Sequence, residues 1–254
     1  MEQKSIIPSL CIEKITFNNG TTIELKNDDI VLLVGANNVG KSRTLKDLKD
    51  DLNNLPKSKV IIDDVVYQSS NFSCSQLRNY FEKNISRDSY GNYNIFLDEN
   101  QMYSFNDSSF NDTIDEKNFY KVFFSFLSTE NRLNITRPIW FNRVVDNRSL
   151  NVKKVLENDS KAIDVLNRML KMGFEKSIDT FEDYLDGTIV KKYKIGKNQE
   201  IIDAINLNRR DNFNMLKNME DLHAQGDGIR SAVAILASLI VNHNSLFLID
   251  EPET

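Results

Sequence analysis

Residues 35–42 constrain the fold more than any other part of this 254-residue chain. They read Gly-Ala-Asn-Asn-Val-Gly-Lys-Ser and fit the pattern G-x-x-x-x-G-K-[ST] without a mismatch. A continuous apolar run at 30–34 precedes them, and a segment that favours a helix, 41–52, follows. Such a run suits a strand that is buried on both faces of a parallel sheet. The order strand, glycine-rich turn and helix therefore predicts an α/β domain with a phosphate-binding loop.

The chemistry of phosphate binding explains this residue order. Glycines let successive backbone N–H groups turn toward one anion, and the helix that begins there adds the positive end of its dipole. Lys41 is predicted to reach the β- and γ-phosphates, and Ser42 to place its hydroxyl on Mg²⁺. Asn37 and Asn38 are either turn-formers or donors to the γ-phosphate. The predicted nucleotide-binding set is Gly35, Ala36, Asn37, Asn38, Val39, Gly40, Lys41, Ser42 and Arg43.

Two carboxylates follow a second apolar run near the end of the chain. Residues 246–249 are all apolar, and Asp250 and Glu251 come directly after them. An acidic strand end is more often simply solvated, but a phosphate loop in the same chain favours a functional interpretation. Asp250 is then the residue that holds Mg²⁺ and its water shell, and Glu251 orients or deprotonates the attacking water.

A glycine-containing turn, residues 225–231, precedes the last predicted helix. Apolar residues recur at steps of three and four from Ile229 to Ile240, which indicates one face of a helix. Two glycines at a helix N-terminus make an anion site, or simply a flexible turn with a cap.

The succession of these motifs resembles the Walker A, signature and Walker B order of ABC ATPases. The resemblance is closest to the SMC-like branch, and within it to the overcoming-lysogenization-defect (OLD) family and related prokaryotic antiviral ATPases. It is carried by GANNVGKS at 35–42, QGDGIRS at 225–231 and LIDEPET at 248–254, and more weakly by LSTENRL at 127–133. It implies an α/β ABC-type P-loop nucleotide-binding domain over 1–254, with an N-terminal antiparallel β subdomain and a helical/β insertion at about 69–220.

The resemblance also assigns roles to residues outside the phosphate loop. It implies that Gly226, Asp227 and Gly228 contact the γ-phosphate bound by a second subunit. The family usually has a serine where Gly226 aligns, so Gln225 or backbone N–H groups would take over that contact. A glutamine joins the Mg²⁺ site in the family. Gln68 and Glu130 are the candidates here, and for Gln68 a polar strand end is the competing interpretation. Phe17 either stacks on adenine or belongs to the core of a hairpin.

The remaining segments give further predictions of secondary structure. Residues 11–17 and 22–25 should form a hairpin around the turn Asn18-Asn19-Gly20. Strands are predicted at 60–67, 188–195 and 199–205, short strands and loops at 69–115, a return to the core at 119–127, and an amphipathic helix at 150–172.

Composition narrows the class of protein. The net charge of −5 and the pI of about 5.2 exclude a globally basic surface for nucleic acid. The lysines at 191, 192, 194 and 197 around Tyr193 form either a DNA-facing patch or a solvated hairpin face. Cys11 and Cys74 are too few for a disulfide scaffold. The longest apolar run, 232–241, is about half a membrane span, and no signal peptide precedes it, so we expect a cytoplasmic protein without membrane contact.

We therefore expect Mg-ATP binding and hydrolysis by a homodimer or higher homo-oligomer. It would regulate a nuclease or other effector in antiviral defence or DNA processing, with DNA as a further partner. The alternative is a non-hydrolysing nucleotide-binding module that orders an oligomer and recruits a partner. The family's chain continues after Asp-Glu-Pro-Glu with an interface loop, a histidine-bearing strand and a TOPRIM nuclease domain. We accordingly expect a fragment that hydrolyses ATP poorly by itself.

Overall fold

The computed structural model describes residues 8–36, 39–53, 60–70, 73–85, 87–98, 101–111, 116–140, 152, 156, 159–185, 188–241 and 246–251. They form a mixed α/β arrangement with both antiparallel and parallel strand pairs. The chain divides into two compact units, one made of residues 1–128 and 244–251 and the other of residues 129–243 and 252–254. We call them unit 1 and unit 2.

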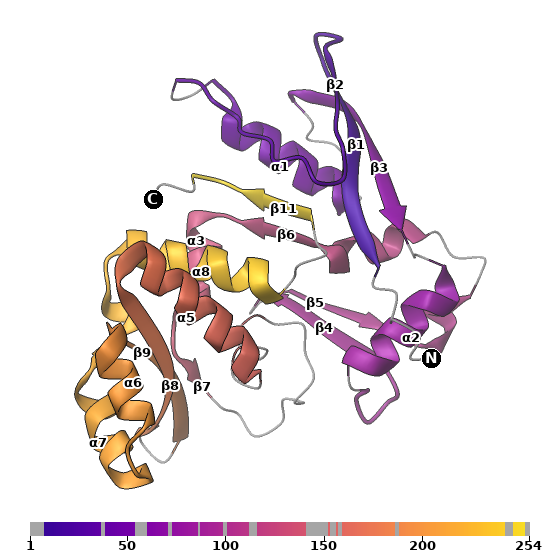
Figure 1. Ribbon diagram of the computed structural model, residues 1–254. Helices are drawn as coiled ribbons and strands as arrows, with labels where there is room; N and C mark the ends of the chain where they lie inside the picture. The colour runs from indigo at the N-terminus through magenta and orange to yellow at the C-terminus, as the bar shows by residue number, and fades with distance from the viewer. Residues whose placement is uncertain are drawn as a thin grey trace, which may run out of the picture. The chain divides into compact units, whose positions relative to one another are not determined.

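Unit 1 contains a three-stranded antiparallel sheet in the order β2-β1-β3 (Figure 1). Its strands are β1 (Ser9–Phe17), β2 (Thr22–Glu24) and β3 (Ile62–Ser70). The turn between β1 and β2 places Gly20 at φ 82°, a left-handed conformation that glycine adopts without steric penalty. The predicted hairpin is therefore confirmed, and its strands belong to an antiparallel sheet.

The second sheet of unit 1 is a parallel pair, β6 (Phe124–Leu127) and β11 (Leu246–Ile249), with Leu246 opposite Phe124 and Ile249 opposite Leu127. Helix α1 (Lys41–Leu52) has the bounds that the sequence predicted, and buries Leu48 and Leu52. Figure 1 shows β11 beside β6, with α1 in the same unit. Both apolar runs, 119–127 and 246–249, are thus in ordered elements, as predicted.

The predicted strand at 30–34 is wrong. These residues form no strand, and Ile30, Leu32 and Val34 are 97%, 74% and 78% exposed. A strand buried on both faces needs a hydrogen-bonded neighbour, and none of the described strands pairs with this run. An apolar run reports how much surface a segment can bury, but it does not specify the strand that will pair with it.

An aromatic cluster occupies the rest of unit 1. It includes Phe81 of helix α2 (Cys74–Asn84), Phe105 of strand β5 (Gln101–Phe105) and Tyr93, which begins strand β4 (Tyr93–Asp98). Phe110 and Phe119 join it from the 3₁₀ helices η1 (Asp107–Phe110) and η2 (Glu116–Phe123). The sequence predicted only short strands and loops here, so α2 is a correction. Ser73 and Gln76 form a capping box, which is the local signal for this helix.

Unit 2 is built on a long antiparallel hairpin, β8 (Lys176–Leu185) and β9 (Thr188–Lys197). Strands β7 (Ile139–Trp140) and β10 (Glu220–Asp221) also pair with β9. Helix α5 (Ser160–Phe174) overlaps the predicted amphipathic helix at 150–172, of which most residues before 159 lie outside the described ones. The remaining elements are α3 (Thr129–Ile135), α6 (Asn198–Ile205), α7 (Arg209–Asn218), the 3₁₀ helix η3 (Leu222–Ala224) and α8 (Asp227–Val241).

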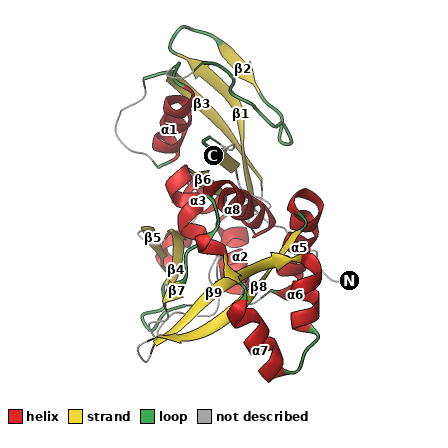
Figure 2. Cartoon of the chain, turned by 90° about the vertical axis from the view of Figure 1, so that its left-hand side faces the viewer, coloured by secondary structure: helices red, strands yellow, loops and turns green. Residues whose placement is uncertain are grey.

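The core of unit 2 joins α5, the hairpin and α8, which Figure 2 shows lying together. Leu166 and Leu170 of α5 and Val233 and Ala237 of α8 are buried in it, which confirms the helical periodicity after residue 228.

Residues 199–205 form helix α6 rather than the predicted strand. Glu200 accepts a hydrogen bond from the backbone N–H of Lys197 over 2.8 Å, as the third residue of a capped helix does. Ile201 and Ala204, three positions apart, then face the same side and are buried together. This spacing of three distinguishes the helix from a strand, in which alternate residues share a face.

Candidate functional site

The predicted phosphate-binding loop leads directly into α1. Gly40 is the residue before the helix and has φ 98°, and a Cβ added to it would lie 2.5 Å from Cδ1 of Ile61. The positive φ therefore favours glycine at this position, whereas the end of the flexible Ile61 side chain could shift to admit a Cβ. Lys41 turns back over its own loop, because Nζ donates hydrogen bonds of 2.7 and 2.9 Å to the carbonyls of Gly35 and Ala36. Asn37 and Asn38 lie outside the described residues.

The loop and the acidic strand end meet at one point. The Ser42 hydroxyl, in the first turn of α1, donates a 2.8 Å hydrogen bond to Oδ1 of Asp250. Asp250 follows β11, and its backbone N–H donates to the carbonyl of Leu127 over 3.1 Å. This bond extends the parallel ladder of β6 and β11 by one residue and fixes the backbone that carries the carboxylate. The structure thus brings together Ser42 and Asp250, two of the residues that the sequence predicted at the metal.

Glu251 is exposed and has a left-handed backbone, with φ 48°. Residues with a Cβ rarely adopt this conformation, which costs of order 1–2 kcal/mol. Such strain is found preferentially at functional sites, where the surrounding structure imposes it.

Arg43, which the sequence placed in the nucleotide-binding set, is paired within α1. Its Nε lies 2.8 Å from Oδ1 of the fully buried Asp47. Oδ2 of Asp47 accepts backbone N–H bonds from residues 60, 61 and 62, at 2.7, 2.7 and 3.2 Å. Burial raises the pKa of Asp47, but the three N–H donors and Arg43 outweigh it and hold that pKa below its ordinary value. Asp47 thereby ties the helix of the phosphate loop to the start of β3.

Gln68 and Glu130 were the two candidates for a further residue at the metal. Gln68 lies within β3, opposite Cys11, and its side-chain oxygen lies 3.7 Å from the Cys11 sulfur. β3 continues to Ser70, so Gln68 is not at a strand end, and its described hydrogen bonds lead to Cys11. Glu130 is exposed in the first turn of α3, in unit 2. Ser42 and Asp250 remain the pair that the structure brings together.

The glycine turn at 225–228 opens α8 at Asp227, two residues before the predicted start of the helical periodicity. Gly226 and Gly228 have no positive φ, and a Cβ added to either would meet nothing within 4 Å. Neither conformation nor packing among the described residues therefore requires glycine here. Gln225 is engaged by Glu220, to which its amide donates over 2.7 Å.

Three of the four lysines of β9 are paired with acidic residues, and the fourth, Lys197, is exposed at the end of the strand. Lys194 is buried and lies 2.6 Å from Asp221, and Lys192 lies 3.0 Å from Asp183. Lys191 lies 3.4 Å from Glu182. Their charges are largely offset in place, and this hairpin adds no support for a DNA-facing patch.

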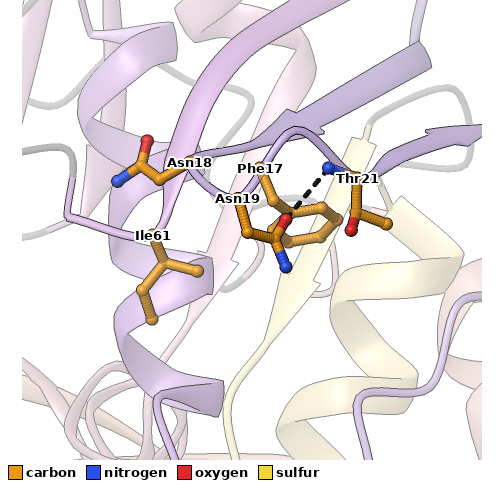
Figure 3. Close-up of a pocket in the computed structure, with 5 residues that line it drawn as sticks. All are labelled: Phe17, Asn18, Asn19, Thr21 and Ile61. Atoms are coloured by element: carbon orange, nitrogen blue, oxygen red, sulfur yellow. Dashed lines mark hydrogen bonds between the residues drawn. The ribbon is translucent and has the colours of Figure 1, made fainter.

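An open pocket of about 300 Å³ lies at the turn between β1 and β2 (Figure 3). It is lined by Phe17, Asn18, Asn19, Thr21 and Ile61, and Ile61 is the residue that closely approaches Gly40. The nitrogen of the Asn18 amide donates to the carbonyl of Val60, while the oxygen of Asn19 accepts from the Thr21 N–H over 2.9 Å. An aromatic ring, an isoleucine and two amides thus surround a concave surface at this turn.

Among the described residues, no three His, Cys, Asp or Glu side chains gather into a metal-binding group. Mg²⁺ accepts few protein ligands and completes its shell with water and substrate phosphates, so a hydroxyl and one carboxylate suit it. No helix in the described part of the chain has both the length and the apolar character that a membrane span requires. Comparison with protein families, with curated proteins and with solved structures found no match.

Proposed function

We propose that this chain binds Mg-ATP at residues 35–42 and hydrolyses it as the nucleotide-binding domain of an ABC-type ATPase. The observation that carries the proposal is the contact between Ser42 and Asp250. Their oxygen atoms are 2.8 Å apart. Neighbouring ligands of an octahedral Mg²⁺ with bonds of 2.0–2.1 Å are separated by about 2.9 Å. The pair is therefore spaced as two adjacent ligands of one magnesium ion.

Lys41 and the backbone of the loop would bind the phosphates. The Lys41 ammonium already donates to two carbonyls of the loop, so its side chain reaches over the concave side of that loop. Exchanging these carbonyls for phosphate oxygens replaces neutral acceptors by charged ones, which form stronger hydrogen bonds. Mg²⁺, when bound, would neutralise charge on the β- and γ-phosphates.

Glu251 is the general base of the proposed reaction. It takes a proton from water while the water oxygen bonds to the γ-phosphorus and the bond from that phosphorus to the ADP oxygen breaks. An exposed carboxylate next to a magnesium ligand suits this role, and its left-handed backbone is consistent with a position that function has selected.

The pocket of Figure 3 is the proposed binding site of the adenine base of ATP. A purine in this pocket would lie against Phe17 and Ile61, and Asn18 and Asn19 are the polar residues of the lining. Aromatic stacking on a base is worth about 1–3 kcal/mol. Of the two interpretations of Phe17, the proposal adopts the one in which its ring stacks on adenine.

The turn at 225–228 is proposed to complete the site of a second copy. Glycine permits close approach of a backbone to a ligand, and the two glycines of this turn have no explanation within the described residues. The regulated effector, a nuclease or another protein of antiviral defence or DNA processing, rests on the family resemblance alone.

Titration of a fluorescent ATP analogue tests the binding site. Lys41→Ala should abolish binding, whereas Lys46→Ala, at an exposed position of the same helix, should leave it unchanged. Equal affinity of the wild type and Lys41→Ala would contradict the assignment of residues 35–42 as the nucleotide-binding loop. Phosphate release then separates hydrolysis from the alternative, a module that binds ATP only to order an assembly.

A further inference from the structure

Two arginines, one from each helix, connect the first turn of α8 to α3. Arg132 of α3 is fully buried, and its Nε donates to the hydroxyl of Ser231 in α8. Arg230 of α8 makes the reciprocal connection: its Nε donates to the Thr136 hydroxyl over 3.1 Å, and its Nη2 to the Leu133 carbonyl over 3.0 Å. All of these residues belong to unit 2. Consecutive residues of α8, 230 and 231, are therefore both fixed to the same neighbouring helix.

Arg230 has a third partner within α8. Its Nη1 lies 3.2 Å from Oδ1 of Asp227. The Arg230 side chain is only 13% exposed, whereas that of Asp227 is 65% exposed. A guanidinium group is planar and rigid, so three bonds in different directions fix its orientation. Arg230 can thus hold the Asp227 carboxylate in a defined position at the surface.

The negative charge of Asp227 opposes the proposed approach of this turn to a phosphate. Backbone N–H groups at a helix N-terminus attract a phosphate, but a carboxylate in the same turn repels it. The Arg230 guanidinium carries the compensating charge and keeps the carboxylate turned to itself.

We infer that Arg230 is a positioning residue of the glycine turn. It anchors the first turn of α8 to α3, and it holds and neutralises Asp227 so that residues 225–228 can approach the phosphate of a nucleotide on a second copy of this chain. The inference rests on the proposed function and deepens it.

The structure also indicates that an Arg230 variant will fold. The buried bond from Arg132 to Ser231 continues to hold α8 against α3 when Arg230 is replaced. Arg230→Met keeps most of the aliphatic length of the side chain and removes the charge and the donors. Arg168→Met, at an exposed position of α5, is the matched control.

Hydrogen exchange measures the anchoring directly. The first helical hydrogen bonds of α8 and α1 come from the N–H groups of Arg230 and Thr44. In Arg230→Met, the amides of residues 230–234 should therefore exchange about tenfold faster than in the wild type, while those of residues 44–48 should not change. Unchanged exchange at 230–234 overturns the anchoring.

Self-association with Mg²⁺ and a non-hydrolysable ATP analogue, measured by sedimentation, tests the electrostatic role. Arg230→Met should weaken the dimer by about tenfold or more without changing nucleotide affinity. Asp227→Asn in the Arg230→Met chain should restore much of the loss, because the repelling charge is then gone. A merely structural role predicts no such rescue.

The outcomes separate this inference from the proposed function. Dimerisation of Arg230→Met at the wild-type level, or no rescue by Asp227→Asn, overturns the inference and leaves nucleotide binding intact. No dimer of the wild type overturns both the inference and the proposed second-copy site. If ATP binding by the wild type did not depend on Lys41, the proposed function itself would be overturned.

Discussion

The Ser42 hydroxyl donates a 2.8 Å hydrogen bond to Oδ1 of Asp250, although the two residues lie 208 positions apart in the chain. Ser42 lies in the first turn of a helix directly after the glycine loop, and Asp250 follows a parallel strand. In parallel sheets, ligands bind beyond the carboxyl ends of the strands. The contact is therefore the part of the structure on which the proposed nucleotide and metal site rests.

Asp250→Asn tests this contact most specifically. Asparagine has the same shape and keeps an oxygen acceptor for Ser42, but it lacks the charge that Mg²⁺ requires. We expect ATP affinity in the presence of Mg²⁺ to fall at least about tenfold, with no change when Mg²⁺ is chelated. Isothermal calorimetry with and without chelator measures both values, and an unchanged Mg²⁺ dependence would exclude Asp250 from the metal site.

Glu251→Gln should keep ATP binding and block turnover, so that any ATP-bound dimer persists longer. The amide cannot take the proton from water, while its shape and left-handed backbone are retained. Steady-state phosphate release from the complete protein is the measurement. Hydrolysis by the variant at the wild-type rate would remove Glu251 from the catalytic role.

Glu251→Gly separates the conformational strain at this position from the proposed catalytic role of the carboxylate. Glycine adopts a positive φ without penalty, so we expect stability to rise by about 1 kcal/mol while hydrolysis is lost. Chemical denaturation beside phosphate release distinguishes the two effects. A glycine variant that is less stable than the wild type would contradict the interpretation of φ 48° as strain.

Phe17→Ala should lower the affinity for ATP about fivefold or more, since stacking on a base is worth roughly 1–3 kcal/mol. Binding of tripolyphosphate, which lacks a base, should not change. Ile23→Ala, at an exposed position of the neighbouring strand β2, is the control. Equal losses for ATP and tripolyphosphate would mean that Phe17 supports the loop rather than the base.

Local patterns in the sequence predicted the first hairpin and helix α1 of unit 1. The turn signal at 18–20 and the helix after the glycine loop depend on residues close in the chain, and both predictions were confirmed. Asp250 and Ser42 were paired in advance because their motifs imply a common metal. That pairing needed a chemical argument, since no local pattern connects residues so distant in sequence.

Packing partners that lie far apart in the chain, and that no motif connects, could not be predicted. The run at 30–34 is apolar enough for a buried strand, but the strand requires a neighbour that its own sequence does not specify. Asp47 resembles an ordinary member of an i, i+4 pair with Arg43. Its bonds to the backbone of 60–62 and the burial of Arg132 against Ser231 depend on tertiary packing. The strand predicted at 199–205 was wrong for a different reason, because a short apolar segment fits both a helix and a strand.

Asp47 should be essential for the stability of the phosphate-loop helix. Asp47→Ala leaves three backbone N–H groups and the Arg43 guanidinium without their acceptor, so we expect a loss of about 3 kcal/mol in the free energy of unfolding. Lys46→Ala, at an exposed position one residue earlier, should cost less than about 0.5 kcal/mol. Equal stability of the two variants would contradict the anchoring role.

The pH dependence gives a second and independent measurement. The folded-state pKa of Asp47 lies below the unfolded value, near 3.8, because the N–H donors and Arg43 outweigh burial. The unfolded chain therefore binds the proton more readily, and the stabilisation is fully present above the unfolded pKa. It should disappear as the pH falls below about 4 and through the folded pKa. Chemical denaturation between pH 7 and pH 3 should thus show a steeper loss of stability for the wild type than for Asp47→Asn, whose amide does not titrate. Parallel curves would show that Asp47 contributes no such linkage and that its hydrogen bonds stabilise the fold independently of charge.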